Sequence, residues 1–292
     1  MIKAEVKEFY LTKIFRQEGR DDGAILTRFR SGTETDKDID RINQNVRDTP
    51  PKNCTILTPY RAAAQRFNDE ALDRIDGEEY TFKASMTGCY TRWKEDKLPY
   101  PSTLRLKEGC RVIIKKNDKR TVKGISQQVF NGNQGVFLGM HKDKVVIRLD
   151  NDNVVFLPKI KETFGTKVQK HSICVNPDDP MEEHRYEERE EHVPDEANQY
   201  VQYPIRLGFA ITISASQGMT LDKVYFDLDG RPLWADAYGL LYVAFSRVRA
   251  LSDLYLSAPI TKEDNRVSPT LKPPEPEQME MDVEEEEDDL QF

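Results

Sequence analysis

Long apolar runs are absent from this sequence. No stretch of about 18 apolar residues occurs among the 292 residues, so the sequence predicts no transmembrane helix and no membrane partner. The N-terminal stretch MIKAEVKEFYL mixes charged and apolar residues and lacks the apolar core of a secretion signal. We therefore expect a protein that is not secreted and acts in the cytoplasm, or in the host cytoplasm if it is viral.

Cysteine is also scarce. The four residues, Cys54, Cys89, Cys110 and Cys174, are widely spaced, which favours a reduced protein over a disulfide framework. His171 and Cys174 form one H-x-x-C pair, but a zinc site needs about four well-spaced ligands. We expect no metal ion bound by this chain alone.

Basic residues are missing from the C-terminal twenty positions. Residues 273–292 hold ten acidic and no basic residues, and without them the formal net charge changes from −8 to +2. Residues 178–196 hold ten acidic and two basic residues, so the remaining body carries about +10. A basic body masked by two acidic segments is compatible with a polyanionic partner, although charge alone does not identify one.

The first hundred residues follow an α/β pattern. Residues 1–48 are polar with helical spacing, and Pro50-Pro51 ends this part. CTILTPY (54–60) is typical of a short strand ending in a proline turn, and 61–75 has helical periodicity. Such a strand, corner and helix make half of a βαβ unit.

The period changes to two after residue 104. RVIIKK, GVFLGM, KVVIRL and NVVFLP read as four short strands, separated by turn signals at Asn131-Gly132 and at 150–153. We predict a small, barrel-like β-module over 104–165, inserted into an α/β domain formed by 49–103 and 204–260.

The rest of the chain alternates polar segments with α/β patterns. Residues 166–203 are acidic and contain prolines, which predicts a mobile loop, and 261–292 is predicted to be a disordered acidic tail. Between them we expect a helix or extended stretch, a strand, a helix and a strand, at 205–217, 222–228, 235–250 and 253–258. Polar residues gather at the corner after the first of these, and in α/β folds such corners carry the chemistry.

Five short motifs resemble, in the right order, those of superfamily-one 5′–3′ DNA helicases of the RecD/Dda-like group. They are LTKIFRQ (11–17), ILTPYR (56–61), RLKEGCRVIIKKND with VFNGNQGVFLG (105–139), YPIRLGFAITISASQGMTLD (203–222) and YVAFSRVRAL (242–251). The resemblance covers about residues 1–260 and matches only the C-terminal half of such an enzyme. It implies a RecA-like P-loop-NTPase-type lobe with an inserted SH3-like β-barrel, preceded by a helical linker over 1–48 that follows the first motor lobe.

The same resemblance assigns roles at the nucleotide. Arg247 matches the family's arginine finger, and Arg16 matches its companion. Arginine suits this role because its guanidinium group stays charged and binds two phosphate oxygens at once. Gln217, Gly218 and Gln17 match nucleotide-contacting positions. Judged without the flanking motifs, both arginines would be helix-surface residues in ordinary ion pairs.

The resemblance also assigns DNA contacts. Short polar side chains bind phosphates without reading bases, as a sequence-tolerant motor requires. The candidates are Thr58, Tyr60, Thr212, Ser214 and Ser216, together with Lys115 and Lys116 in the basic run KKNDKRTVKG. The alternatives are a Thr-Pro turn, a polar helix cap and a solvated loop. Ser214-Ala215 departs from the His-Lys pair common in the family.

The phosphate-binding motif G-x-x-x-x-G-K-[ST] is absent, and so is an Asp-Glu pair after an apolar strand. ATP and Mg²⁺ would therefore bind only with a complementing first lobe. That lobe would be a partner chain from a split gene, or the rest of a longer protein. A third possibility is a free-standing accessory protein without ATPase activity that binds single-stranded DNA or a replication partner. The retained motifs favour the first two.

The last residues, MEMDVEEEEDDLQF, resemble the tails of single-stranded-DNA-binding proteins. Such tails place a terminal aromatic ring, here Phe292, in a partner's pocket and carboxylates on its basic residues. The tail would dock on a replication protein, or fold back onto this chain's own basic surface. A solvated tail that aids solubility is the third alternative.

Overall fold

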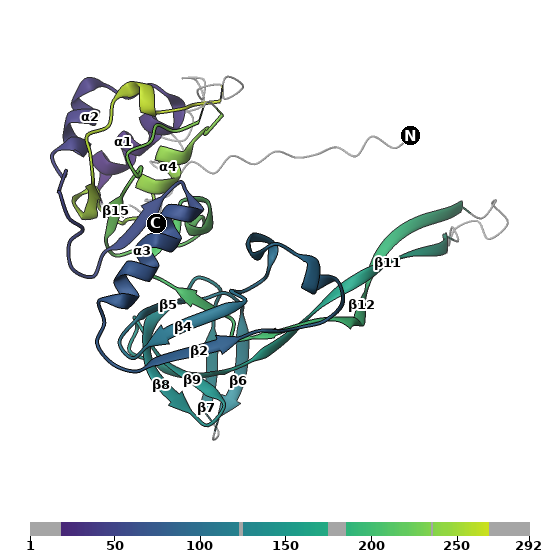
Figure 1. Cartoon of the computed structure of the whole chain (residues 1–292). Coiled ribbons are helices and arrows are strands. Elements are labelled where there is room, and N and C mark those ends of the chain that lie inside the picture. The colour runs from purple at the N-terminus through teal and green to yellow at the C-terminus, as the bar shows by residue number, and fades with distance from the viewer. Residues whose placement is uncertain (1–18, 123–124, 175–184, 235, 269–292) are drawn as a thin grey trace, which may run out of the picture. The chain divides into compact units, whose positions relative to one another are not determined.

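The computed structural model describes residues 19–122, 125–174, 185–234 and 236–268. The chain forms two compact units (Figure 1). Among the described residues, unit 1 comprises 19–69 and those from 209 to 268, and unit 2 comprises those from 70 to 208.

Unit 1 is built on a parallel four-stranded sheet with the order β14-β1-β15-β16. Its strands are β1 (Thr55–Thr58), β14 (Ala210–Thr212), β15 (Val224–Phe226) and β16 (Leu254–Leu256). β1 is central and pairs with β14 and β15 in parallel, with Thr58 opposite Thr212. Because the strands run in parallel, their carboxyl ends meet at one edge, where ligands bind in open α/β sheets.

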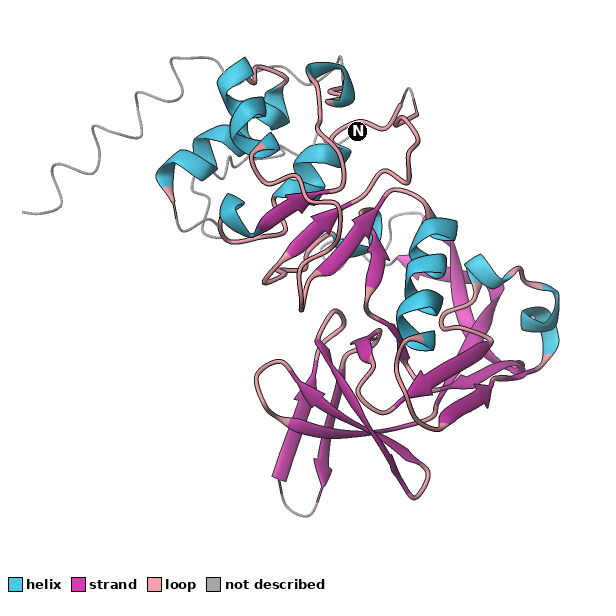
Figure 2. Ribbon diagram, turned by 60° about the vertical axis from the view of Figure 1, so that its left-hand side comes forward, coloured by secondary structure: helices cyan, strands magenta, loops and turns pink. Residues whose placement is uncertain are grey.

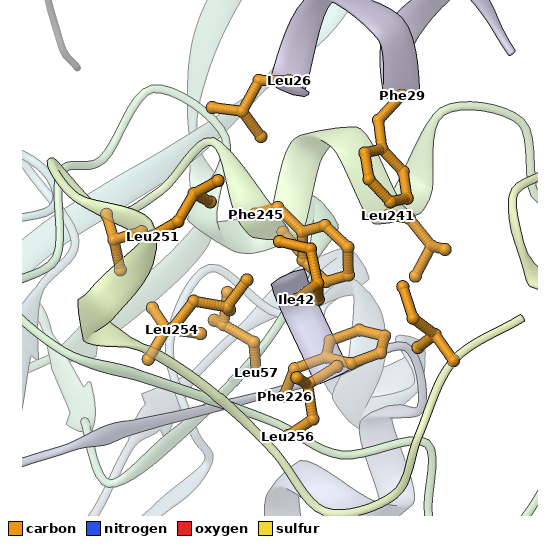
Figure 3. Packing of buried hydrophobic residues seen from close by; sticks show 14 of the residues in the cluster. Leu26, Phe29, Ile42, Leu57, Phe226, Leu241, Phe245, Leu251, Leu254 and Leu256 are labelled. Carbon is orange, nitrogen blue, oxygen red and sulfur yellow. The ribbon is translucent and has the colours of Figure 1, made fainter. Parts of the chain in front are cut away.

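Helices cover both faces of this sheet. Successive β1 side chains point to opposite faces, so Leu57 packs against α1 (Arg20–Ser31), α2 (Asp36–Asn43) and α4 (Leu240–Phe245), whereas Ile56 packs against α3 (Arg61–Asp73). Figure 3 shows Phe29 of α1 and Phe245 of α4 in the first core, and their rings meet edge to face at 5.5 Å. Coverage of both faces explains why TILT is buried throughout.

Two segments can be compared with their predictions. The helix expected over 235–250 is, within the described residues, limited to α4, because Gly239 at its N-cap has a left-handed backbone with φ of 70°. The stretch 205–217, predicted as a helix or an extended stretch, is extended: it contains β13 (Ile205–Leu207), β14 and a short 3-10 turn, η3 (Ser214–Ser216). The helix predicted over 61–75 is confirmed as α3.

Unit 2 contains the predicted antiparallel β-module. The four expected strands are β5 (Arg111–Ile114), β8 (Gln134–His141), β9 (Lys144–Leu149) and β10 (Val154–Pro158), in the sheet order β10-β9-β8-β5-β13. The fifth strand, β13, pairs with β5 and so places Ile205 opposite Ile114. Residues 205–207 therefore belong to this module and not to the α/β domain predicted from 204.

Two hairpins extend unit 2. β6 (Asp118–Val122) pairs with β7 (Ile125–Val129), so residues 118–122 of the basic run, predicted as a loop, lie in a hairpin strand. β2 (Glu79–Lys83) pairs with β4 (Thr103–Lys107), which places residues 70–103 in unit 2 rather than in the α/β domain. Strands dominate this unit (Figure 2). Short 3-10 turns, η1 (Gly88–Arg92) and η2 (Glu95–Lys97), lie between β3 (Ser85–Met86) and β4.

Within the segment predicted as a mobile loop, residues 166–174 and 185–202 belong to a long β-ribbon. β11 (Ile160–Cys174) pairs with β12 (Arg185–Gln202) from Ile160↔Gln202 to Cys174↔Arg185 (Figure 1). The register shifts at Gly165, opposite Pro194. Proline has no N–H to donate to the ladder, so an irregularity at this point is expected.

The ends of unit 1 also differ from the prediction. The described part of the predicted linker, 19–48, is not a separate element, because α1 and α2 pack into the core of unit 1. Residues 261–268, predicted as part of the tail, are ordered: Asn265 donates to the Phe29 carbonyl at 2.9 Å, beside η5 (Lys262–Asp264). Residues 269–292 lie outside the described residues.

The mixed α/β class is confirmed. Within the described ranges, no helix has the length and apolar character needed to cross a membrane. In the same part of the chain, no three His, Cys, Asp or Glu residues form a group able to hold a metal ion.

Candidate nucleotide and nucleic-acid interface

The carboxyl ends of β1 and β14 bring two predicted DNA-contact threonines together. Thr58 and Thr212 lie opposite each other, and the Ile213 amide donates to the Thr58 carbonyl at 3.0 Å. Thr58 is fully buried, in a central strand whose two faces are both covered by helices. Its side chain does not reach solvent, so the predicted direct contact by Thr58 does not fit this structure; Thr212 is half-buried at the same edge.

The turn after β14 carries the other polar candidates. Ser216 is fully buried and donates to the Ile213 carbonyl at 2.7 Å, so it shapes the turn and is not open to a ligand, contrary to prediction. Ser214 and Gln217 are exposed. Gly218 has φ of 85°, a conformation that side-chain-bearing residues rarely adopt, and a β-carbon at this position would meet no atom within 4 Å. The turn therefore presents a hydroxyl and an amide to solvent.

Arg247 is buried against this turn. Its Nη1 donates to the carbonyl oxygens of Ser216 and Met219, both at 3.3 Å, and its Nε donates to the Val243 carbonyl at 2.7 Å. The Leu221 amide donates to the Arg247 carbonyl at 2.9 Å. Arg247 is only 6% exposed, so it is neither a helix-surface arginine nor a guanidinium open to solvent.

These contacts join the two predicted nucleotide motifs. Arg247 lies 31 residues after Ser216 in the chain, yet the two are in direct hydrogen-bond contact. A cation that binds backbone carbonyls on both sides of Gly218 fixes the position of the turn. Any movement of Arg247 must therefore move the turn that carries Gln217.

The loop after β15 lies at the same edge and holds Tyr60. The Tyr60 hydroxyl donates to the Pro232 carbonyl at 2.6 Å. The Arg231 guanidinium lies over the Tyr60 ring, 5.1 Å from its centroid, and the Trp234 ring meets the same ring edge to face at 6.0 Å. Trp234 is 43% exposed. Tyr60 is thus part of an aromatic and cationic cluster, not of a Thr-Pro turn alone.

An ion-pair network fixes this loop. Asp229 accepts from Arg66 of α3 at 2.6 Å and lies 3.0 Å from Arg231. The hydrogen bond from Arg66 lowers the pKa of the Asp229 carboxyl below its usual value. Asp229 and Gly230 both have positive φ, 57° and 65°. The network holds this strained turn in one conformation.

The two lysine candidates lie in unit 2. Lys116 makes an ion pair with Glu162 at 2.7 Å, and the same Glu162 oxygen accepts from the Tyr100 hydroxyl at 2.6 Å. Its predicted DNA contact would have to compete with this pair. Lys115 is half-buried, and burial lowers the pKa of its ammonium group.

Sequence reasoning missed Arg231 and Trp234. The signal was present, because DGRPLW follows the predicted strand 222–228 directly, and such positions gather at the ligand edge of a parallel sheet. Arg16 and Gln17 lie outside the described residues.

The chain fits part of a nucleotide site. The exposed Gln217 provides a side-chain amide, and Gly218 provides backbone with no atom close to its α-carbon substituent position. Both lie in the turn that the Arg247 cation binds. A phosphate cradle is missing from the sequence, and the described residues hold no acidic cluster suited to Mg²⁺.

Comparison with curated proteins identifies helicase relatives. The chain is 27% identical over 235 residues to the ATP-dependent DNA helicase Pif1 of Bdellovibrio bacteriovorus, covering 80% of this chain and 46% of that protein. It is 26% identical over 251 residues to the ATP-dependent DNA helicase PIF1 of Mus musculus, covering 84% of this chain and 33% of that protein. The chain therefore spans a third to a half of the length of these relatives. No protein-family model matches it.

Solved structures share the fold. Unliganded Pif1 from Bacteroides sp. matches with a TM-score of 0.63 and 22% identity, over 94% of this chain and 55% of that one. Bacteroides Pif1 bound to single-stranded DNA matches with a TM-score of 0.61 and 22% identity, over 95% and 56% of the two chains. At this identity the likeness concerns the fold alone.

Proposed function

We propose that this chain, which is homologous to Pif1-family superfamily-one helicases over most of its length, forms the C-terminal motor half of an ATP-dependent DNA helicase. Unit 1 is the second RecA-like motor lobe, and the antiparallel module of unit 2 is its SH3-like insertion. The relatives' names supply the reaction class, ATP-dependent DNA unwinding, with 5′–3′ movement as in the resembling group.

The contact between Arg247 and the turn at Ser216–Met219 carries this proposal. A motor must convert nucleotide state into movement on DNA, and here one arginine links the two motifs assigned to these tasks. In our proposal Arg247 and Arg16 neutralise charge on the ATP phosphates, and Gln217, Gly218 and Gln17 contact the nucleotide. The turn then transmits the change to Thr212 and Ser214 at the DNA edge.

ATP would bind between unit 1 and a first lobe carrying G-x-x-x-x-G-K-[ST]. That lobe, on the same or another polypeptide, would supply the phosphate cradle and the Mg²⁺ ligands. Single-stranded DNA would follow the strand ends through Tyr60, Thr212 and Ser214. Lys115 and Lys116 would add phosphate contacts from unit 2.

The test combines the full chain with a first-lobe polypeptide that bears the missing motif. Single-stranded-DNA-stimulated ATP hydrolysis is expected only in the mixture. Arg247→Ala should lower the rate by on the order of 10³-fold or more, as arginine-finger removal does. Arg41→Ala is the matched control, because Arg41 is an exposed arginine on α2. Thermal unfolding of both variants separates loss of the finger from loss of the fold.

A second candidate function follows from the burial of Arg247. Since this arginine already binds four oxygen atoms within its own chain, it is equally suited to a structural role. The chain would then be an accessory protein without ATPase activity that binds single-stranded DNA or a replication partner. No hydrolysis in the mixture, together with intact DNA binding, would select this function.

We also propose that the acidic segment ending in Phe292 binds a replication protein or the chain's own basic surface. Deleting 273–292 tests this. Higher DNA affinity with a steeper salt dependence would support the autoinhibitory form, and loss of a partner would support docking. If the affinities for DNA and for the partner are both unchanged, the tail serves only to keep the protein soluble.

A further inference from the structure

The loop after β15 and the end of β1 build an exposed aromatic platform. We propose that Trp234, supported by Tyr60, stacks on a nucleobase of single-stranded DNA. This inference rests on the proposed function, since it extends the DNA edge of unit 1 from phosphate contacts to base contacts.

The platform is held in place from several sides. Tyr60 lies two residues after the end of β1, and its hydroxyl donates to the Pro232 carbonyl, which holds the ring against the loop. Arg231 covers one part of that ring, and Trp234 packs against another. Asp229 ties the loop to α3 through Arg66. A rigid support of this kind lowers the entropy lost when a ligand binds.

Exposure and charge point to a nucleic-acid ligand. A large apolar ring with 43% of its surface exposed would normally be buried, and here it lies beside two guanidinium groups that share a single carboxylate. Two guanidinium groups, balanced by the carboxylates of Asp229 and Asp227, therefore lie next to an open aromatic face. Single-strand-binding proteins combine the same two features, because the cation attracts the phosphate and the ring stacks on the base.

The position of the platform fits a strand that crosses the sheet edge. The order β14-β1-β15 places the ends of three neighbouring strands in a row. The first end carries Thr212 and Ser214, the second Tyr60, and the third the loop with Arg231 and Trp234. A DNA backbone bound at the hydroxyl groups would bring a base to the aromatic rings. Stacking accepts every base, so the platform would hold DNA without choosing a sequence.

Fluorescence tests this placement directly, because the chain has two tryptophans, Trp93 and Trp234. In the full chain carrying Trp93→Phe, Trp234 is the only indole reporter. Oligothymidine should quench its emission, whereas an abasic oligonucleotide of the same length should bind by its phosphates without comparable quenching. Binding to oligothymidine without quenching would overturn the proposal.

Affinity measurements provide the second arm. Trp234→Ala should weaken oligothymidine binding by roughly 5- to 150-fold and leave its salt dependence unchanged, because stacking involves no counterion. Trp234→Phe keeps a ring and should retain most of the affinity. Arg231→Gln should instead reduce the salt slope by about 1. Phe130→Ala is the matched control, since Phe130 is an exposed aromatic residue of unit 2.

The outcomes distinguish failure of the stacking proposal from failure of the proposed DNA-binding function. If the full chain binds no single-stranded DNA, both the DNA edge and the platform are wrong. If it binds DNA and Trp234→Ala behaves like Phe130→Ala, the platform alone is wrong. If Trp234→Ala loses DNA affinity and Trp234→Phe retains it, stacking is supported. A general loss of the fold would be recognised because it would also lower the thermal unfolding temperature.

Discussion

Arg247 donates from Nη1 to the carbonyl oxygen of Ser216 at 3.3 Å, across a sequence separation of 31 residues. This bond joins the end of α4 to the turn after β14. Arg247 therefore holds the turn, and in the proposed function it also supplies positive charge to the nucleotide. Substitutions that separate these tasks are therefore more informative than simple loss of activity.

Arg247→Ala should lower the free energy of unfolding by about 2–4 kcal/mol, because several buried carbonyls lose a charged donor. Arg247→Lys should cost less, since it retains the charge but cannot reach all the oxygens that the planar guanidinium binds. Urea denaturation measures both values. Arg41→Ala, at an exposed position, should stay within about 0.5 kcal/mol of the wild type. An Arg247→Ala value as small as that of the control would mean that the burial of Arg247 contributes little to the fold.

Much of the strand framework could be predicted, and the reason is local. The alternation in RVIIKK, GVFLGM, KVVIRL and NVVFLP defines strands that fold with their sequence neighbours, and the turn signals lie between them. The α3 helix was predicted for the same reason. Such patterns need no information from distant parts of the chain.

The errors arose where a distant partner decides the structure. β13 pairs with β5, some ninety residues earlier, so local periodicity could not assign it to the β-module. The acidic composition of 166–203 predicted a mobile loop, yet β11 and β12 pair within this segment. Arg247 was expected to be accessible, but its carbonyl partners become visible only when the turn at Ser216 lies beside α4.

Asn68 of α3 clamps the edge strand β14. Its amide nitrogen donates to the Ala210 carbonyl at 2.8 Å, and its oxygen accepts from the Ala210 amide at 2.9 Å. Asn68→Asp should lose about 1–3 kcal/mol of stability at pH 7, because a carboxylate would face a carbonyl oxygen in a buried site. The measurement is the free energy of unfolding as a function of pH.

The pH dependence of Asn68→Asp has a defined sign. Burial and the facing carbonyl raise the pKa of the new carboxyl in the folded state. Its stability is therefore closest to wild type below the unfolded pKa of about 4 and falls as pH rises through the folded pKa. Asn151→Asp is the control, because the Asn151 oxygen only accepts a hydrogen bond, from the Asn153 amide, and a carboxylate accepts equally well. A constant deficit across this pH range would contradict the account.

Asp38 stabilises the start of α2 through a second pH-dependent contact. It accepts from Arg28 at 2.6 and 2.8 Å and completes a capping box with Thr35. The hydrogen bond from Arg28 holds the pKa of Asp38 well below its usual range. Asp38→Asn should cost about 1–3 kcal/mol at neutral pH, because the charged partner of Arg28 is lost.

The stability difference between wild type and Asp38→Asn should be constant above about pH 4 and shrink as pH falls towards the folded pKa. A lowered folded pKa means that the carboxylate stabilises the fold above the unfolded pKa and that this contribution is lost on acidification. Asp40→Asn, on an exposed position of the same helix, is the control and should show no such trend. A difference that grows on acidification would refute the assignment.

Substitution of Gly218 tests backbone strain in the turn through its effect on stability, separately from its effect on function. With φ of 85° and open space around it, Gly218→Ala should destabilise the chain by about 1–2 kcal/mol through the backbone alone. Gly88→Ala should cost more, because its β-carbon would overlap Asn198 and lie 2.6 Å from the Ala197 carbonyl oxygen. Thermal unfolding of the two variants tests this order.

The functional effect of Gly218→Ala should exceed its effect on stability. In the proposed function the turn moves during the ATP cycle, and we expect it to bend at Gly218, between the two carbonyls that Arg247 holds. Alanine restricts that bending. In the mixture with a first-lobe polypeptide, we expect stimulation of ATP hydrolysis by single-stranded DNA to fall while DNA affinity is retained. Unchanged stimulation in a folded Gly218→Ala variant would mean that the turn is static and that coupling between nucleotide and DNA runs through other residues.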